Sequence, residues 1–299
     1  MEHAGDILAS FLRTDPHVAA LIDEALALEA DDAQSAGALG FMARALVQAT
    51  MPHSQPPTHV FERTNGAFTL TMMAPPKVGL PYGSMPRLVL AWLTTEAVRT
   101  KSRILVLGDS LSGFMRQLGL VPTGGRWGSI TRLRMQAHRL FASTVSCLYE
   151  GDARERAEAG FRIADRHMLW WDPKSPEQTE LYGSSITLSE ASYREIVARP
   201  VPIDLRALRA LSRSPMQLDL YVWLTYRMSY LRRATTVPWP LLQLQFGAEY
   251  HRARDFKAAF VDHLRKVLSV YRTAHVDPTP AGLRLHPSSP HIRHDSFTR

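Results

Sequence analysis

The chain has 299 residues, of which 45% are hydrophobic, and it carries a single cysteine and a formal net charge of +7 at pH 7. That length suits about two domains of roughly 100–200 residues each, and the lone Cys147 excludes an intrachain disulfide and a cysteine-based zinc cluster. No apolar run approaches the roughly 18 residues of a membrane span, and no basic region precedes an apolar stretch at the N-terminus, so we expect a cytoplasmic protein of bacterial style without membrane contact.

The charge is distributed unevenly along the chain. Residues 1–80 carry 4 Lys/Arg against 9 Asp/Glu, whereas the rest of the chain carries 31 against 19. A basic body behind an acidic N-terminal segment suggests a polyanionic partner such as nucleic acid. A soluble protein that merely has a high isoelectric point is the other interpretation of the charge alone.

Residues 1–55 are expected to form an acidic, helical N-terminal segment. Residues 4–50 are rich in alanine, leucine and acids, which predicts two helices broken near DDAQSAG. The prolines of MPHSQPPTH, residues 51–59, predict a linker. Asn65-Gly66 then lies between two β-prone runs and predicts a short hairpin.

Residues 56–200 are expected to form a first domain. The pattern predicts a helix from Ser84 to Thr100, a short strand over RILVL and a short helix that ends at Gly119. After the glycine-rich turn PTGGRWG, a long helix is predicted over SITRLRMQAHRLFASTVSCL. A β-hairpin made of FRIADRHMLWWD and LYGSSITLS and a helix over SEASYREIVAR complete this domain.

Residues 201–292 are expected to form a second domain of the same design, followed by a tail over 293–299. It contains a helix over SPMQLDLYVWLTYRMSYL, a short helix over VPWPLLQLQFG, a basic helix capped by Asp255, and two short strands around a Pro/Gly turn. The shared order is typical of the winged helix-turn-helix. The predicted fold is therefore α+β and mainly helical, with two tandem winged-helix domains and small β-hairpin wings; an α+β protein with two helical lobes is the alternative.

The stretch ILVLGDSLSG at residues 104–113 looks like the nucleophile block of GDSL-type serine esterases. Such an enzyme needs a base within hydrogen-bond reach of the serine, and in GDSL-type esterases that base belongs to a DxxH block. None of the fifteen aspartates is followed by histidine three residues later. We therefore expect Asp109 or Ser110 to cap the helix that follows.

Other catalytic and metal-binding patterns are also lacking in the sequence. There is no G-x-x-x-x-G-K-[ST] motif and no G-x-G-x-x-G after a strand. His286, His291 and His294 cluster near the C-terminus in a stretch rich in proline and serine and without cysteine, which favours an exposed tail over a metal site. We predict a protein that is not an enzyme and that uses no cofactor and no metal.

The first basic region lies between residues 110 and 149, which contain no acid and five arginines. On a helical wheel one face is apolar, and Arg132, Met135 and Arg139 lie opposite it. Such a helix could enter a major groove, where arginine reads guanine or holds phosphates; a solvated arginine face is the alternative. The DNA contacts predicted here are Arg126, Thr131, Arg132 and Arg139.

The second basic helix is the better candidate for reading a sequence. Phe256, Phe260, Leu264, Val267 and Tyr271 are predicted to face the core. Arg252 and Arg254 lie just before the helix, where backbone N–H groups favour a phosphate, and the small Ala258 would let the backbone approach base edges. The DNA contacts predicted here are Arg252, Arg254, Ala258, Arg265, Lys266 and Ser269.

Several long stretches resemble the RepA-type plasmid replication initiators. They include GLPYGSMPRLVLAWLTTEAVRTKSRILVLGDSLSGFMRQLGLVPTGGRWGSITRLRMQAHRLF, ITLSEASYREIVARPVPIDLRALRAL, SPMQLDLYVWLTYRM, VPWPLLQLQFG and GLRLHPSSPHI. The likeness runs from about residue 60 to residue 292 and includes GDSLSGFM within the first domain.

The resemblance implies a DNA-binding initiator of plasmid replication. Such a protein binds repeated sites, or iterons, in double-stranded origin DNA, helps to open an adjacent AT-rich stretch and recruits host replication proteins for helicase loading; many also form homodimers. A winged-helix transcriptional regulator is the alternative function, and a GDSL-type hydrolase a remote one.

Overall fold

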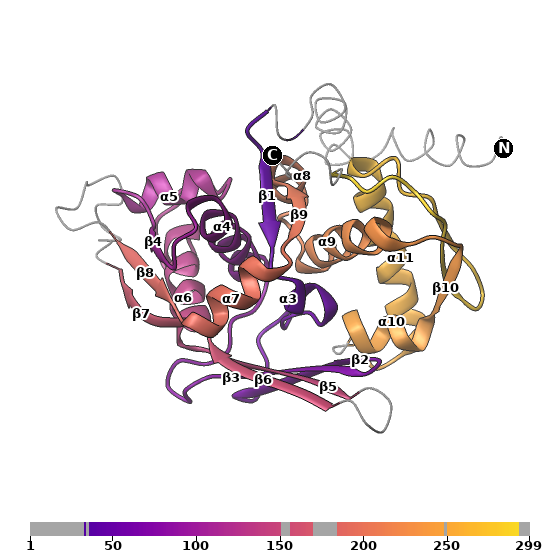
Figure 1. The fold of residues 1–299 in the computed structure, drawn as a ribbon, viewed down its shortest axis with the longest axis horizontal. Coiled ribbons are helices and arrows are strands. Elements are labelled where there is room, and N and C mark those ends of the chain that lie inside the picture. The colour runs from indigo at the N-terminus through magenta and orange to yellow at the C-terminus, as the bar shows by residue number, and fades with distance from the viewer. Residues whose placement is uncertain (1–32, 34–35, 151–155, 170–183, 248–249, 293–299) are drawn as a thin grey trace.

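The computed structural model describes residue 33 and residues 36–150, 156–169, 184–247 and 250–292. The two helices predicted over residues 4–50 lie for the most part outside these residues, as does the tail 293–299. The described chain mixes helices and strands, with two helical lobes side by side and a sheet beneath them (Figure 1). Among the described residues no helix is both long and apolar enough to cross a bilayer.

The first unit follows the predicted order closely. Its elements are α4 (Ser84–Thr100), β4 (Ile104–Val106), α5 (Leu111–Gln117), α6 (Ser129–Ala142), β7 (Ala164–Met168) and β8 (Ser185–Leu188). The three strands form an antiparallel sheet in the order β4-β8-β7. Strand β8, the last of the three in sequence, therefore lies in the middle of the sheet, between β4 and β7.

The second unit repeats this arrangement. Its elements are α9 (Pro215–Tyr230), β10 (Thr235–Pro238), α10 (Trp239–Phe246), α11 (Ala253–Val270), β11 (Val276–Pro278) and β12 (Gly282–Leu285). The antiparallel sheet has the order β10-β12-β11, which matches the first unit strand for strand. Strand β10 was not predicted, because the single β-prone run TTVP is too short to stand out from the loop around it.

A four-stranded antiparallel sheet, β2-β3-β5-β6, spans the base of the molecule (Figure 1). Its strands are β2 (Val60–Asn65), β3 (Phe68–Met73), β5 (Thr144–Glu150) and β6 (Arg156–Arg162). The hairpin predicted at Asn65-Gly66 is confirmed as β2–β3, in which Asn65 pairs with Phe68. Strand β2 also contacts α10 of the second unit, so the sheet links the two lobes.

The long helix predicted over residues 129–148 is shorter than expected. It ends at Ala142, and the Ser143 hydroxyl donates a hydrogen bond to the Arg139 carbonyl (2.7 Å). The chain then becomes β5, which pairs with β3 along its length. The prediction was wrong because β-branched Thr144 and Val145 favour a strand and because β3, about 70 residues away in sequence, supplies the pairing.

A two-stranded ladder stands between the two lobes (Figure 1). Strand β1 (Leu39–Met42), which is followed by α3 (Arg44–Gln48), pairs antiparallel with β9 (Val201–Asp204). Residues 36–55 are therefore not the wholly helical segment that the composition predicted, since they also contain a strand that pairs with β9, about 160 residues further along the chain. Helices α7 (Glu190–Ala198) and α8 (Leu205–Ala210) flank β9.

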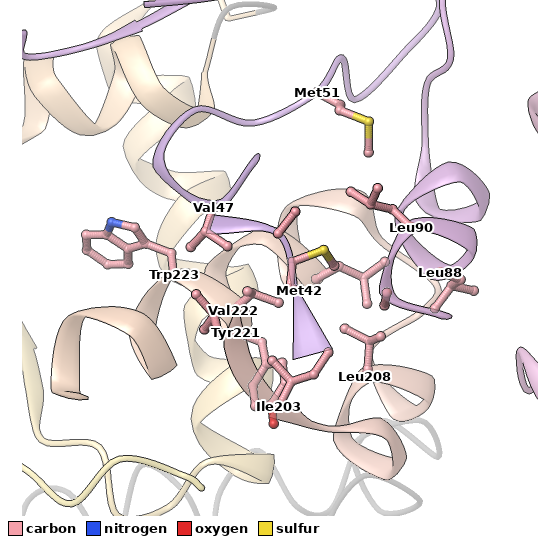
Figure 2. Packing of buried hydrophobic residues seen from close by; sticks show 14 of the residues in the cluster. Met42, Val47, Met51, Leu88, Leu90, Ile203, Leu208, Tyr221, Val222 and Trp223 are labelled. Atoms are coloured by element: carbon pink, nitrogen blue, oxygen red, sulfur yellow. The ribbon is translucent and has the colours of Figure 1, made fainter. Parts of the chain in front are cut away.

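The hydrophobic core is continuous from one unit to the other. Figure 2 shows its middle, where Met42 and Val47 from the N-terminal segment meet Leu88 and Leu90 of α4 and Val222 of α9. Each of these side chains is at most 5% exposed. The two lobes therefore share apolar side chains as well as a backbone connection.

A buried ion pair joins the two units inside this core. The Arg87 guanidinium on α4 donates to both carboxylate oxygens of Asp219 on α9 (Nε–Oδ1 and Nη2–Oδ2, both 2.7 Å). Arg87 also donates to the carbonyls of Met51, Pro52 and Gly83. The segment 51–59, predicted as a linker, is irregular in backbone, yet Met51 is buried, so its first residues belong to the core.

Two local predictions near the C-terminus also differ from the structure. Helix α11 begins at Ala253 with Arg252 at its N-cap position, so Asp255 lies in the first turn and does not cap the helix. His291, predicted to lie in an exposed tail, is half-buried, and its Nδ1 lies 2.7 Å from the Tyr221 hydroxyl. The strap around residues 289–292 therefore packs on α9.

Candidate nucleic-acid interface

The serine of the GDSL-like stretch has a structural role. The Ser110 hydroxyl accepts a hydrogen bond from the Gly113 backbone N–H (3.1 Å) at the N-terminus of α5. This is the capping geometry that satisfies one of the free N–H groups of a helix start. The prediction that Asp109 or Ser110 caps this helix is confirmed, and the cap is Ser110.

The turn before α6 is held by a dense set of hydrogen bonds. The backbone N–H of Thr123 donates to the Ser129 hydroxyl, and the N–H of Ser129 donates to the Thr123 hydroxyl (both 2.9 Å). The Ser129 hydroxyl donates to the Val121 carbonyl (2.6 Å). Gly128 packs so tightly against the carbonyls of Thr123 and Gly124 that a Cβ would overlap them. The first turn of α6 is thereby fixed relative to the loop in front of it.

Helix α6 turns one apolar face inward and part of its arginine set outward. Ile130, Leu133, Ala137, Leu140 and Phe141 are buried. Thr131 and Arg132 are exposed, as is Arg126 in the preceding turn. The Thr131 hydroxyl donates to the Gly125 carbonyl (3.0 Å), so this side chain supports the turn.

Arg139 differs from the outward position predicted for it. It is half-buried, its guanidinium carbon lies 5.3 Å from the centroid of the Tyr82 ring, and its Nη1 lies 3.4 Å from the Leu80 carbonyl oxygen. These contacts tie α6 to the segment before α4. Arg139 does lie on the face of α6 opposite its apolar side, as the helical wheel predicted. The segment 79–82 covers that end of the helix, however, so the side chain does not reach solvent fully.

Helix α11 has the most amphipathic arrangement in the second unit. The predicted inward residues Phe256, Phe260, Leu264, Val267 and Tyr271 are all buried. The exposed side chains include Arg252, Arg254, Ala258 and Arg265. Positions 254, 258 and 265 fall on one side of a helix with 3.6 residues per turn, so they form one stripe that begins at the helix N-terminus. We call these three residues, together with Arg252 at the N-cap position, the α11 stripe.

The other two residues predicted on α11 are less available. The Lys266 ammonium lies 3.1 Å from a carboxylate oxygen of Asp262, one turn earlier. The Ser269 hydroxyl donates to the Lys266 carbonyl (2.7 Å). Both side chains are half-buried at the edge of the stripe, and the charge of Lys266 is already compensated in part.

Sequence reasoning missed several exposed groups near these helices. Trp127 is 78% exposed, and the Arg126 guanidinium carbon lies 5.1 Å from the centroid of its ring. Arg232, Arg233 and Arg284 are exposed on the loop before β10 and on β12. Helical periodicity gives no information about which residues of a turn or of a short strand are exposed. The adjacent pair Arg232-Arg233 was the one signal in the sequence that pointed to them.

His167, on the strand beside α6, contributes little positive charge at neutral pH. His138 of α6 and His167 of β7 meet edge to face, with ring centroids 5.6 Å apart. Burial, the neighbouring His138 and Arg162 lower the pKa of His167. The arginines exposed on this surface, by contrast, stay charged at any physiological pH.

The fold thus defines a protein of mixed helices and antiparallel strands in which two similarly built units each place a helix with exposed arginines beside a small sheet. The chain belongs to the family of plasmid-encoded RepA proteins, whose sequence model matches residues 80–240. This match confirms the resemblance to the plasmid replication initiators. It covers the whole first unit and the beginning of the second.

Two solved structures of RctB are similar to this chain. A selenomethionine derivative of RctB domains 2 and 3 is 11% identical, with a TM-score of 0.53 and coverage of 83% of this chain and 99% of that one. Another crystal structure of RctB domains 2–3 (residues 155–483) is 13% identical, with a TM-score of 0.48 and coverage of 77% and 83%. At these identities the similarity concerns the fold alone. None of the curated proteins matches the chain.

Proposed function

We propose that this protein initiates plasmid replication by binding repeated sites in double-stranded origin DNA, without an enzymatic activity of its own. The observation that carries the proposal is the pair of like units, each with a helix that exposes arginines, in a chain of the RepA family. Opening of an AT-rich stretch and recruitment of host replication proteins belong to the same proposal. Homodimerisation and a cytoplasmic location are part of it as well.

We further infer that each unit is a winged helix-turn-helix. The order helix, strand, helix, helix, strand, strand occurs twice, interrupted in the first unit by β5 and β6 of the four-stranded sheet, and in both three-stranded sheets the last strand is the central one. In such a module the second helix of the pair enters the major groove, which assigns that position to α6 and α11. The paired strands β7–β8 and β11–β12 are the proposed wings.

The two helices are proposed to divide the work. The α11 stripe combines Arg252 and Arg254 at the helix start, where phosphates bind favourably, with Ala258 and Arg265 further along. Helix α6 exposes Arg126 and Arg132, while Arg139 is engaged by Tyr82. We infer that α11 reads bases and that α6 mainly positions the duplex through phosphates.

A salt titration of arginine variants tests this division on duplexes that carry the origin repeats or a scrambled sequence. Arg265→Ala should weaken the cognate duplex by about 1–3 kcal/mol and spare the scrambled one, because it removes a base contact. Arg252→Ala should weaken both and reduce the salt slope by about one unit, because it removes a phosphate contact. Arg213→Ala, an exposed arginine before α9, is the charge-matched control.

Two results would contradict the assignment. If Arg265→Ala and Arg252→Ala weaken the two duplexes alike, α11 does not read bases. If the wild-type chain does not prefer the repeats over the scrambled duplex at any salt concentration, the proposed origin binding itself is wrong.

A further inference from the structure

The loop in front of α6 carries the two most exposed large apolar side chains of the described chain. Trp127 is 78% exposed and Val121 is 76% exposed, whereas the other exposed large hydrophobic residues reach at most 61%. A tryptophan side chain has 150–250 Å² that folding could bury. Leaving it in solvent on a structured loop forgoes that stabilisation and keeps the face of the indole available for stacking.

The loop presents the indole from a fixed base. The hydroxyls of Thr123 and Ser129 close the turn on either side of Trp127 through four hydrogen bonds between 2.6 and 3.0 Å. Gly128 packs directly against the carbonyls of Thr123 and Gly124, and this contact also fixes the backbone of the turn. A loop whose backbone is held in this way loses little conformational freedom when it binds, which favours affinity.

The charge around the indole fits a polyanion. Arg126 lies over the Trp127 ring at 5.1 Å, and Arg132 is exposed one turn into α6. Residues 110–149 contain no acid. A flat aromatic face beside arginines is the arrangement with which proteins hold single-stranded nucleic acid, since bases stack on the ring and the backbone lies along the positive charge.

Double-stranded DNA can stack on such a ring less readily than single-stranded DNA can. In double-stranded DNA the face of each base is covered by its neighbours, and only base edges, sugars and phosphates remain accessible. An unpaired base exposes its whole face, and stacking depends little on which base it is. The arrangement at Trp127 therefore favours a base from a single strand.

We propose that Trp127, together with Arg126, is a stacking site for an unpaired DNA base. The inference rests on the proposed function, because origin opening would supply such a strand next to the bound duplex. It adds to that function a contact with the opened strand, made by the loop in front of α6 and separate from the base reading assigned to α11.

The test compares Trp127→Ala, Trp127→Phe and wild-type protein by fluorescence anisotropy on a labelled 20-nucleotide single strand and on a duplex with the origin repeats. Trp127→Ala should weaken single-strand binding roughly 5- to 150-fold, the range for loss of one base–aromatic stack. It should change duplex affinity by less than about twofold. Trp127→Phe should retain most of the single-strand affinity because an aromatic face remains.

Tyr230→Ala provides the matched control. Tyr230 is also an exposed aromatic residue, at 44%, with an arginine, Arg227, 5.5 Å from the centroid of its ring, but it lies at the end of α9. Its removal should leave single-strand binding unchanged. Tryptophan emission gives a second readout: the single strand should quench the wild-type protein more strongly than Trp127→Phe, since only the wild type stacks an indole on a base.

The outcomes separate this inference from the proposed function. Unchanged single-strand binding by Trp127→Ala, or an equal loss on single strand and duplex, would overturn the stacking site even if the wild type binds the repeats. A wild type that ignores the repeats but binds single strands through Trp127 would support the stacking site and reject the proposed origin binding.

Discussion

At the scale of single residues, the structure shows how a polar group is held in the core. Asp219 is almost fully enclosed, and burial alone would raise its pKa, but the charge of Arg87 and the hydrogen bonds from Arg87 and His53 hold the pKa below its usual value. Three backbone carbonyls accept the other guanidinium hydrogen bonds. The pair is therefore completely satisfied, which is the condition under which a buried ion pair is tolerated.

Asp219→Ala should cost about 3–5 kcal/mol in the free energy of unfolding, because the Arg87 charge would stay buried without its partner. The control is Asp262→Ala, which removes a partly exposed pair with Lys266 at 3.1 Å and should cost less than about 1 kcal/mol. Urea denaturation followed by circular dichroism measures both. Equal losses in the two variants would mean that the Arg87–Asp219 pair is not a principal link between the units.

At the scale of elements, the turn before α6 determines where that helix and its arginines lie. The sequence PTGGRWG has three glycines, but they are not equivalent. Gly125 has a positive φ of 87°, a conformation that side chains rarely adopt. Gly128 has an ordinary φ of −66° and is needed for space alone, whereas nothing lies within 4 Å of the place where a Cβ on Gly124 would be.

Gly128→Ala should lower stability by about 1–3 kcal/mol, the usual cost of forcing an extra methyl into a packed site. It should also weaken DNA binding, because the displaced turn carries Arg126 and the start of α6. Gly124→Ala in the same turn should stay within about 0.5 kcal/mol of wild type. Thermal unfolding and a gel-shift assay check both variants; if they behave alike, tight packing at Gly128 does not position α6.

At the scale of the whole molecule, the two units behave as one body because they share a core, the β1–β9 ladder and the Arg87–Asp219 pair. Four histidines are buried or half-buried in this shared structure. Burial is the largest cause that lowers the pKa of His53, His167, His263 and His291. These four histidines therefore take up protons near the ordinary histidine pKa of about 6.5 in the unfolded chain, but only at lower pH in the folded chain.

Stability should consequently be retained above about pH 6.5 and fall as the pH drops from there toward 5, since the unfolded state then binds more protons than the folded one. His53→Gln should reduce this slope by up to about 1.4 kcal/mol per pH unit, the effect of one proton. Urea titrations at pH 7.5, 6.5 and 5.5 measure the slope; a slope that is flat or of opposite sign would refute the argument.

The sequence by itself determined the local features of this protein. Apolar periodicity placed α4, α9 and α11, the serine before an apolar run identified the cap at Ser110, and the turn residues at Asn65-Gly66 identified the β2–β3 hairpin. Each depends on interactions between residues a few positions apart. The long stretches of family-like sequence also sufficed to place the chain among the RepA proteins.

The tertiary structure alone decided the features that join distant segments. Strand β5 replaces the end of a predicted helix because β3 pairs with it, and Arg139 lies against Tyr82 because the segment before α4 covers that end of α6. Arg87 and Asp219 are 132 positions apart, and nothing near either residue distinguishes them from surface charges. A single sequence records the periodicity of each element but not which element lies across from it, so pairings over such distances become visible only in the folded chain.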